Sequence, residues 1–281
     1  MDSRSIGRSL VAGLLSVAFL ALFLGIWHLA TLPKAENAGP SDEYAKLLGK
    51  GTKKSDGFPS LAQMGEVALG HLKDPLYDRG PNDKGIAIQL GHSLARVGAG
   101  YLLAILFAVP LGFLIGMSPL LYQALNPFIQ VLKPISPLAW MPLALYTIKD
   151  SSISGVFVIF ICSVWPMLIN TAFGVASVRR DWLAVAKTLE VKPLRKAFVV
   201  ILPAAAPTIL TGMRISIGIA WLVIVAAEML VGGTGIGYFV WNEWNNLNLT
   251  NVIFAILVIG VMGMLLDFGI GRLQKAVTYV E

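Results

Sequence analysis

The residues that could hold a metal or form a covalent intermediate are few and widely separated in this sequence. No two of the three histidines, His28, His71 and His92, have the spacing of three or four residues that places two ligands on one helix face. The single cysteine, Cys162, lies in an apolar run, so one chain offers neither a disulfide nor a thiolate cluster. We therefore expect no metal site, no catalytic residue and no cofactor bound by this chain itself.

A run of glycines, Gly232-Gly233-Thr234-Gly235-Ile236-Gly237, might be taken for a nucleotide-binding loop. Loops of that kind follow a strand and open a helix, whereas this run follows a long apolar segment. The chain also lacks the Gly-x4-Gly-Lys-Ser/Thr pattern of a phosphate loop. We expect a turn here, held by hydrogen bonds from its backbone to Glu228, and any ATP with Mg²⁺ would have to be held by another subunit.

Other charged residues lie inside apolar segments, where a charge needs a partner or a wet path. If the chain carries an anion, Lys133 and Arg214 could lower the barrier to its crossing. Each could equally reach the membrane surface or pair with a helix C-terminus. With Pro137 and Glu228 they are our candidates for a translocation pathway.

The elements that carry these residues are those of a membrane protein. Of 281 residues, 56% are hydrophobic and 14% are charged, which is far from the balance of a soluble domain. The net charge of +6 comes from short basic segments between apolar ones, so topology explains it better than nucleic-acid binding.

We predict an all-α integral membrane fold with six transmembrane helices, some interrupted by proline. The first could be a signal peptide, but its long apolar core favours a retained span. The third holds four prolines, which indicate either a broken helix that lines a polar path or a kinked packing helix. The six segments are Leu10 to Leu32, Val97 to Met117, Tyr122 to Ile148, Ile153 to Val175, Pro207 to Val231 and Val252 to Gly271.

Basic residues cluster between the fourth and fifth segments and are absent between the fifth and sixth, which places the cluster in the cytoplasm of a bacterial inner membrane. Both termini then face the cytoplasm as well. The resulting divisions are 1–32, a cytoplasmic start and first span; 33–85, a periplasmic loop; and 86–281, a transmembrane core that contains the basic cluster.

A short amphipathic helix is predicted at about 181–192, within that basic cluster. Asp181 can cap it, and Pro193 forces a break before a second turn that leads to Pro203. Trp182, Val185, Ala186 and Leu189 fall on one face at helical spacing. A solvated basic loop that only fixes topology is the alternative.

This stretch resembles the signature of the membrane subunits of binding-protein-dependent ABC importers: Glu-Ala-Ala, three residues, Gly, nine residues, then Ile-x-Leu-Pro. Here Ala184-Val185-Ala186 stands for the triplet, Glu190 for the glycine and Val200-Ile201-Leu202-Pro203 for the end. In that family the segment is the coupling helix, which docks on an ATPase subunit. The resemblance thus implies a type I permease, with a five-helix core plus an N-terminal helix. The coupling residues it implies are Asp181, Trp182, Val185, Ala186, Leu189, Glu190 and Lys192.

A narrower resemblance, to the nitrate, bicarbonate and cyanate branch, rests on motifs spread over the chain from Asp74 onward. They include Asp74 to Asp78, Gly80 to Gly85, Ser136 to Trp140, Trp165 to Thr171, and Gly218 to Trp221 through Trp241 to Asn246. Nitrate-type permeases look most similar, which implies import of nitrate or nitrite. Bicarbonate, cyanate and sulfonate permeases of the same superfamily are the alternatives.

By this resemblance the chain works with a second permease subunit, two identical copies being simplest. The other implied partners are two ATP-binding cassette ATPases and a periplasmic or lipid-anchored binding protein. An ion-coupled secondary transporter is a weaker alternative, because it would be expected to carry acidic or histidine relays deep in several spans.

Overall fold

The computed structural model describes residues 3–32, 58–80 and 83–277, and this part of the chain is helical apart from turns and one isolated bridge, Asp78 to Lys84. The expectation of a loop from Pro33 to Gly57 lies outside the described residues. The helices are α1 (Ser3–Ala30), α3 (Leu61–Lys73), α4 (Ile86–Met117), α5 (Pro119–Leu132), α6 (Pro137–Ile148), α7 (Ser151–Ala176), α8 (Arg180–Thr188), α9 (Pro193–Lys196), the π-turn η1 (Ala197–Ile201), α10 (Leu202–Val231), α11 (Ile236–Asn245) and α12 (Leu249–Val277).

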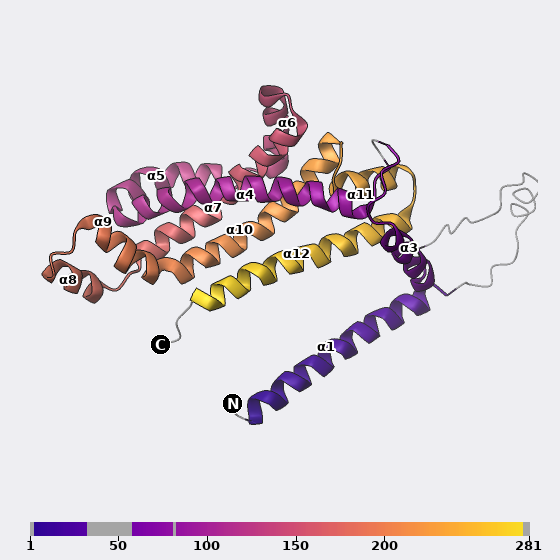
Figure 1. The fold of residues 1–281 in the computed structure, drawn as a ribbon, viewed down its shortest axis with the longest axis horizontal. Helices are drawn as coiled ribbons and strands as arrows, with labels where there is room; N and C mark the ends of the chain where they lie inside the picture. Colours follow the sequence, from indigo (N-terminus) through magenta and orange to yellow (C-terminus); the bar gives the residue numbers. More distant parts are fainter. Residues whose placement is uncertain (1–2, 33–57, 81–82, 278–281) are drawn as a thin grey trace, which may run out of the picture.

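The core is formed by α4, α7 and α10, which lie side by side (Figure 1). Small residues let these helices approach closely. A Cβ atom at Gly112 would lie 2.7 Å from the carbonyl oxygen of Leu168, and one at Gly212 would lie 2.6 Å from Cβ of Asn170. Such contacts are too short for any larger side chain, so glycine sets the spacing of α7 from both of its neighbours.

Five helical stretches are long and apolar enough to cross a membrane, and the bent pair α5 and α6 makes a sixth span if it is counted as one. The six-span, all-helical fold is therefore confirmed. Two predicted boundaries were wrong: the second span begins at Ile86 and not at Val97, and the fifth continues a helical stretch that begins at Pro193 and not at Pro207. In both cases polar residues at the helix end hid its true start.

The third span is broken, since α5 and α6 meet at an angle of 91°. Of the two alternatives for the segment from Tyr122 to Ile148, the structure shows the broken helix and not the kinked one. The break falls at Lys133-Pro134-Ile135-Ser136, and Pro137 begins α6. Each proline removes a backbone donor and disfavours helical geometry in the residue before it, so two prolines three residues apart end one helix and start the next.

Two short helices, α3 and α11, cover one end of the core (Figure 1). His71 fixes α3 there, because its ring stacks on Phe254 at 4.9 Å and lies 3.3 Å from Oδ1 of Asn251. The predicted turn before α4 is also present, with Gly85 N–H donating to the Tyr77 carbonyl at 2.7 Å. Within it, the hydrogen bond from Lys84 lowers the pKa of the Asp78 carboxyl.

The opposite end of the molecule carries α8, together with the start of α1 and the end of α12 (Figure 1). The basic residues Arg179, Arg180, Lys187, Lys192, Arg195 and Lys196 all lie in or beside α8 and α9 at this end. Their position is that of a cytoplasmic surface if the excess of Lys and Arg sets orientation.

Candidate functional site

Two parts of the structure hold functional candidates: α8 at one end, and a buried polar cluster at the other. The sequence predicts α8 at the correct place, but the helix runs from Arg180 to Thr188 and not from about 181 to 192. Its N-cap is Arg179, and Asp181 lies in the first turn, so the prediction that Asp181 caps the helix was wrong. An acidic side chain in the first turn still interacts favourably with the positive end of the helix dipole.

The exposed surface of α8 is apolar along one side. Trp182, Val185 and Leu189 are 41%, 59% and 70% exposed, whereas Ala186 is buried. Ala186 therefore does not share the exposed face, although it was predicted on it. Leu183 packs on a second small core of Val175, Val178, Ile201, Ala205 and Ile209, which seats α8 against the start of α10. An uncovered apolar face on a well-seated helix is a surface suited to a partner.

The C-terminus of α8 takes a left-handed backbone at Glu190, whose φ is 49°. The chain then turns back, with Glu190 N–H donating to the Lys187 carbonyl at 3.0 Å and Val191 N–H to that of Ala186 at 3.1 Å. This is the helix-ending geometry that glycine usually supplies. Glu190 stands where the family signature has glycine, so the chain keeps the turn without the residue that best fits it.

A basic groove of about 620 Å³ separates α8 from α9. Lys187, Lys192 and Lys196 line it, together with Glu190. Three ammonium groups and one carboxylate give the groove a positive charge, so an acidic partner surface would complement it.

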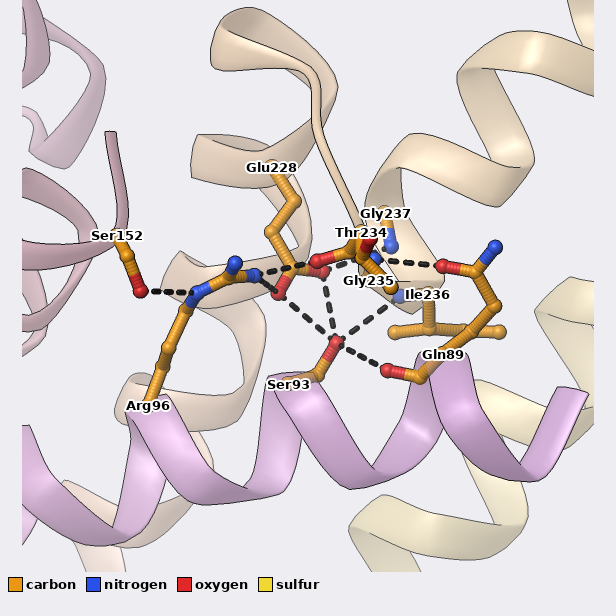
Figure 2. A network of polar contacts seen from close by, with 9 residues as sticks. All are labelled: Gln89, Ser93, Arg96, Ser152, Glu228, Thr234, Gly235, Ile236 and Gly237. Carbon is orange, nitrogen blue, oxygen red and sulfur yellow. Dashed lines mark hydrogen bonds and ion pairs between the residues drawn. The ribbon is translucent and has the colours of Figure 1, made fainter. Parts of the chain in front are cut away.

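The polar cluster at the other end lies between α4, α7, α10 and the glycine turn (Figure 2). Glu228 of α10 is only 4% exposed, and its Oε1 lies 2.7 Å from Nη1 of Arg96 on α4. Ser93 Oγ lies 2.9 and 2.8 Å from the two carboxylate oxygens. The Gly237 backbone N–H donates to Oε2 at 3.0 Å, the kind of bond expected from the sequence. The carboxylate is thus paired and hydrogen-bonded, as a buried charge must be.

Sequence reasoning missed Gln89, Ser93 and Arg96. They follow one another at intervals of four and three residues, which puts all three on one side of α4. That spacing was a usable signal, but the second span was drawn from Val97, so Arg96 was counted as lying outside it. The partner, Glu228, is 132 residues away in sequence.

The remaining pathway candidates are dispersed. Arg214 forms two hydrogen bonds of 2.6 Å with Asp267 of α12, one from Nε and one from Nη2. Lys133 is exposed at the C-cap of α5, and Pro137 begins α6 across the break. The structure therefore does not bring Lys133, Arg214 and Glu228 together within one chain, and their place on a pathway stays a prediction.

Comparison with known proteins gives the same assignment for most of the chain. Residues 108–279 match the family described as binding-protein-dependent transport system inner membrane component. The chain is 45% identical over 262 residues to the nitrate import permease protein NrtB of Leptolyngbya laminosa, covering 93% of this chain and 86% of the relative. It is 45% identical over 207 residues to the bicarbonate transport system permease protein CmpB of Synechocystis sp., covering 73% of this chain and 74% of the relative.

Among solved structures, an inward-facing form of the MetNI methionine ABC transporter is similar, with a TM-score of 0.62 at 14% identity. That similarity covers 69% of this chain and 96% of the other. At such low identity it concerns the fold alone, which is that of type I ABC importer permeases. With a family match over more than half of its length, relatives at 45% identity and this fold, the chain belongs to the binding-protein-dependent transport system inner membrane components, the permease subunits of ABC importers.

Proposed function

We propose that this chain forms the membrane pathway of an ATP-driven importer for a small inorganic anion, nitrate or nitrite. The observation that carries the proposal is the 45% identity to a nitrate import permease along 93% of the chain. Bicarbonate is the second candidate, favoured by the equal identity to a bicarbonate permease over 73% of the chain. Cyanate and sulfonates are carried by related branches and complete the set of anions to be compared.

In this proposal α8 is the coupling helix, and the energy comes from ATP and Mg²⁺ held by two ATPase subunits rather than by this chain. The uncovered side chains of Trp182, Val185 and Leu189 are the apolar part of the docking surface. Lys192 and Glu190 border the basic groove that would face acidic groups of the ATPase. Asp181 and Ala186 act on the helix itself, one in its first turn and one on its buried side.

The end that carries α8 would then face the cytoplasm, with both termini, and the end that carries α3 and α11 would receive the binding protein. A second permease subunit, two identical copies being simplest, would complete the pathway. Lys133, Pro137, Arg214 and Glu228 remain our predicted pathway positions, contributed by both copies.

The decisive experiment is to purify the chain with its neighbouring subunits, reconstitute the complex in vesicles and measure ATP hydrolysis with binding proteins loaded with each anion. We expect nitrate or nitrite to stimulate hydrolysis. Stimulation by bicarbonate alone would transfer the assignment to the second candidate. Stimulation by a sulfonate alone would overturn the choice of an inorganic anion.

Docking by α8 has its own test. Leu189→Asp places a charge on the exposed apolar face, and burying that charge against a partner is costly. We expect this variant to assemble its spans but to lose stimulated ATP hydrolysis. Ala276→Asp, at the exposed end of α12, also adds one carboxylate and is the matched control. Full stimulated turnover in Leu189→Asp would contradict the docking proposal.

A further inference from the structure

The first backbone amides of α11 have no local cap, and three side chains from other helices satisfy them (Figure 2). Gly235 N–H donates to Oε1 of Gln89 at 2.6 Å, and Ile236 N–H donates to Oγ of Ser93 at 2.9 Å. Gly237 N–H donates to Glu228. Since helix N-termini leave such donors unpaired, these bonds fasten α11 to α4 and α10.

Arg96 adds two more connections to the same cluster. Its Nε donates to Oγ of Ser152 on α7 at 3.0 Å, and its Nη1 donates to the Thr234 carbonyl in the glycine turn at 2.6 Å. Only a planar, forked guanidinium offers donors in this arrangement, because a lysine carries its charge at a single atom. Through one side chain, therefore, α4 is joined to α7, α10 and the turn.

The turn needs its glycines for this approach. Gly232 and Gly233 have φ values of 78° and 95°, which side chains seldom adopt. A Cβ atom at Gly237 would lie 2.9 Å from Cβ of Glu228. The turn can therefore approach the carboxylate of Glu228 closely only because glycine occupies these positions.

Separating these groups would leave a guanidinium and a carboxylate buried without partners, which is strongly unfavourable. The Arg96 side chain is 14% exposed and that of Glu228 is 3% exposed, so water cannot readily replace the lost bonds. The adjoining cavity, lined in part by Arg96, Gly155 and Gly232, has room for about one water molecule, at roughly 10 Å³.

We propose that Arg96 is a positioning residue for transport: with Glu228 it holds α4, α7, α10, the glycine turn and the start of α11 as one unit through the whole cycle. Glu228 also neutralises Arg96, so the guanidinium does not become a strong site that would retain an anionic cargo. The role of Arg96 in transport rests on the proposed function. The cluster of hydrogen bonds does not depend on which anion is carried.

Kinetics separate a positioning residue from one that contacts cargo. Arg96→Lys keeps the charge but loses the fork, and the loss of one charge-assisted hydrogen bond is expected to lower the maximal uptake rate per assembled transporter by about tenfold. The KM for the anion should stay unchanged. Arg79→Lys, on the exposed turn before α4, controls for a changed cation at this end of the molecule and should alter neither value.

A raised KM with an unchanged maximal rate in Arg96→Lys would place Arg96 in contact with cargo and overturn the proposal. Wild-type values of both quantities would overturn it too, as would equal losses in Arg79→Lys. If Arg96→Lys does not assemble, Ser152→Ala removes only the Nε bond and is expected to give the same pattern with a smaller loss of rate.

Hydrogen exchange tests the single unit without any substitution. The amides of Gly235, Ile236 and Gly237 should stay protected in the complex at rest and during ATP hydrolysis stimulated by loaded binding protein. Loss of protection during turnover would show that the cluster opens, which would overturn the proposal. The experiment uses whichever anion stimulates hydrolysis. Its result can therefore be interpreted even if the nitrate assignment is wrong.

Discussion

At the scale of single residues, the most unusual backbone position is Glu190, which ends α8 in a left-handed conformation. A side chain there brings Cβ close to a neighbouring carbonyl oxygen, at a cost of about 1 kcal/mol or more compared with glycine. The chain tolerates this cost at the tip of the segment that we propose as the docking surface. Strain at such a position is consistent with a functional constraint on the side chain.

Glu190→Gly should therefore stabilise the end of α8. Removing a penalty of about 1 kcal/mol should slow local opening roughly fivefold. The measurement is hydrogen exchange of the Glu190 and Val191 amides, which bond to the carbonyls of Lys187 and Ala186. Glu190→Ala removes the same charge but keeps Cβ, so it serves as the control. Equal slowing in both variants would assign the effect to charge instead of backbone geometry.

Arg214 and Asp267 supply a second prediction at this scale, because their two bonds of 2.6 Å form a bidentate pair between α10 and α12. Neutralising one partner leaves the other charge alone within a membrane span. We expect Arg214→Gln and Asp267→Asn to reduce the amount of assembled protein severalfold, and the double variant to recover it. Size-exclusion chromatography of equal membrane samples measures this recovery.

Uptake by that double variant then addresses the pathway prediction for Arg214. Normal uptake by well-assembled protein would show that the pair is structural. Slow uptake by well-assembled protein would show that the Arg214 charge acts on the anion.

At the scale of elements, the connection between α8 and α10 contains a π-turn, Ala197–Ile201, on which α8 rests. Its cause lies in the next residues: Pro203 has no N–H to donate, and its ring would clash with the carbonyl of Val199 in a regular helix. The wider turn, closed by a bond from Leu202 N–H to the Ala197 carbonyl, avoids that clash. An extra residue in a helix is characteristic of functional positions.

Deleting Val199, which is 63% exposed, shortens the connection by one residue and should rotate α8 and α9 by about 100° about the axis of α10. We expect the spans to assemble while stimulated ATP hydrolysis falls to its basal rate. Val199→Leu keeps the length and should behave as wild type. Normal stimulation after the deletion would mean that the orientation of α8 does not matter.

Elements whose signals are local were predictable from the sequence. The turn from Asp74 to Gly85, the break near Pro134 and the helix start at Pro193 all follow from proline and glycine chemistry. The 91° angle between α5 and α6 was not predictable, because prolines fix where a helix stops but not where the next one points. The bond between Arg96 and Glu228 was not predictable either, since it depends on how α4 packs against α10.

At the scale of the whole molecule, α1 stands apart from the core (Figure 1). Only 6% of the most apolar stretch of this helix is buried inside the structure. The indole Nε1 of Trp27 in α1 donates a hydrogen bond to the Pro59 carbonyl at 2.8 Å. The Trp27 ring also lies 5.4 Å from the ring of Phe58, just before α3. Membrane lipid or a neighbouring subunit is thus the natural surrounding of α1, and its orientation relative to the core depends on a small contact.

Trp27→Ala should loosen α1 without unfolding the core. We expect a broader distribution of distances between spin labels on α1 and α12, with little change in the unfolding temperature of the complex. Trp27→Phe keeps a ring but loses the hydrogen bond, worth about 1 kcal/mol, and should give an intermediate width. Leu20→Ala, on the exposed side of α1, is the control. A large drop in unfolding temperature for Trp27→Ala would show that α1 supports the core.

The two ion pairs of α10 have a mechanical consequence. Arg214 ties it to α12, and Glu228, 14 residues or about 21 Å further along, ties it to α4. Because α10 is held at two distant points, it cannot rotate at one of them without straining the ion pair at the other. If α8 rotates the start of α10, the rotation would therefore strain the ion pair on the other side of the bilayer. A helix held more loosely would absorb the same rotation.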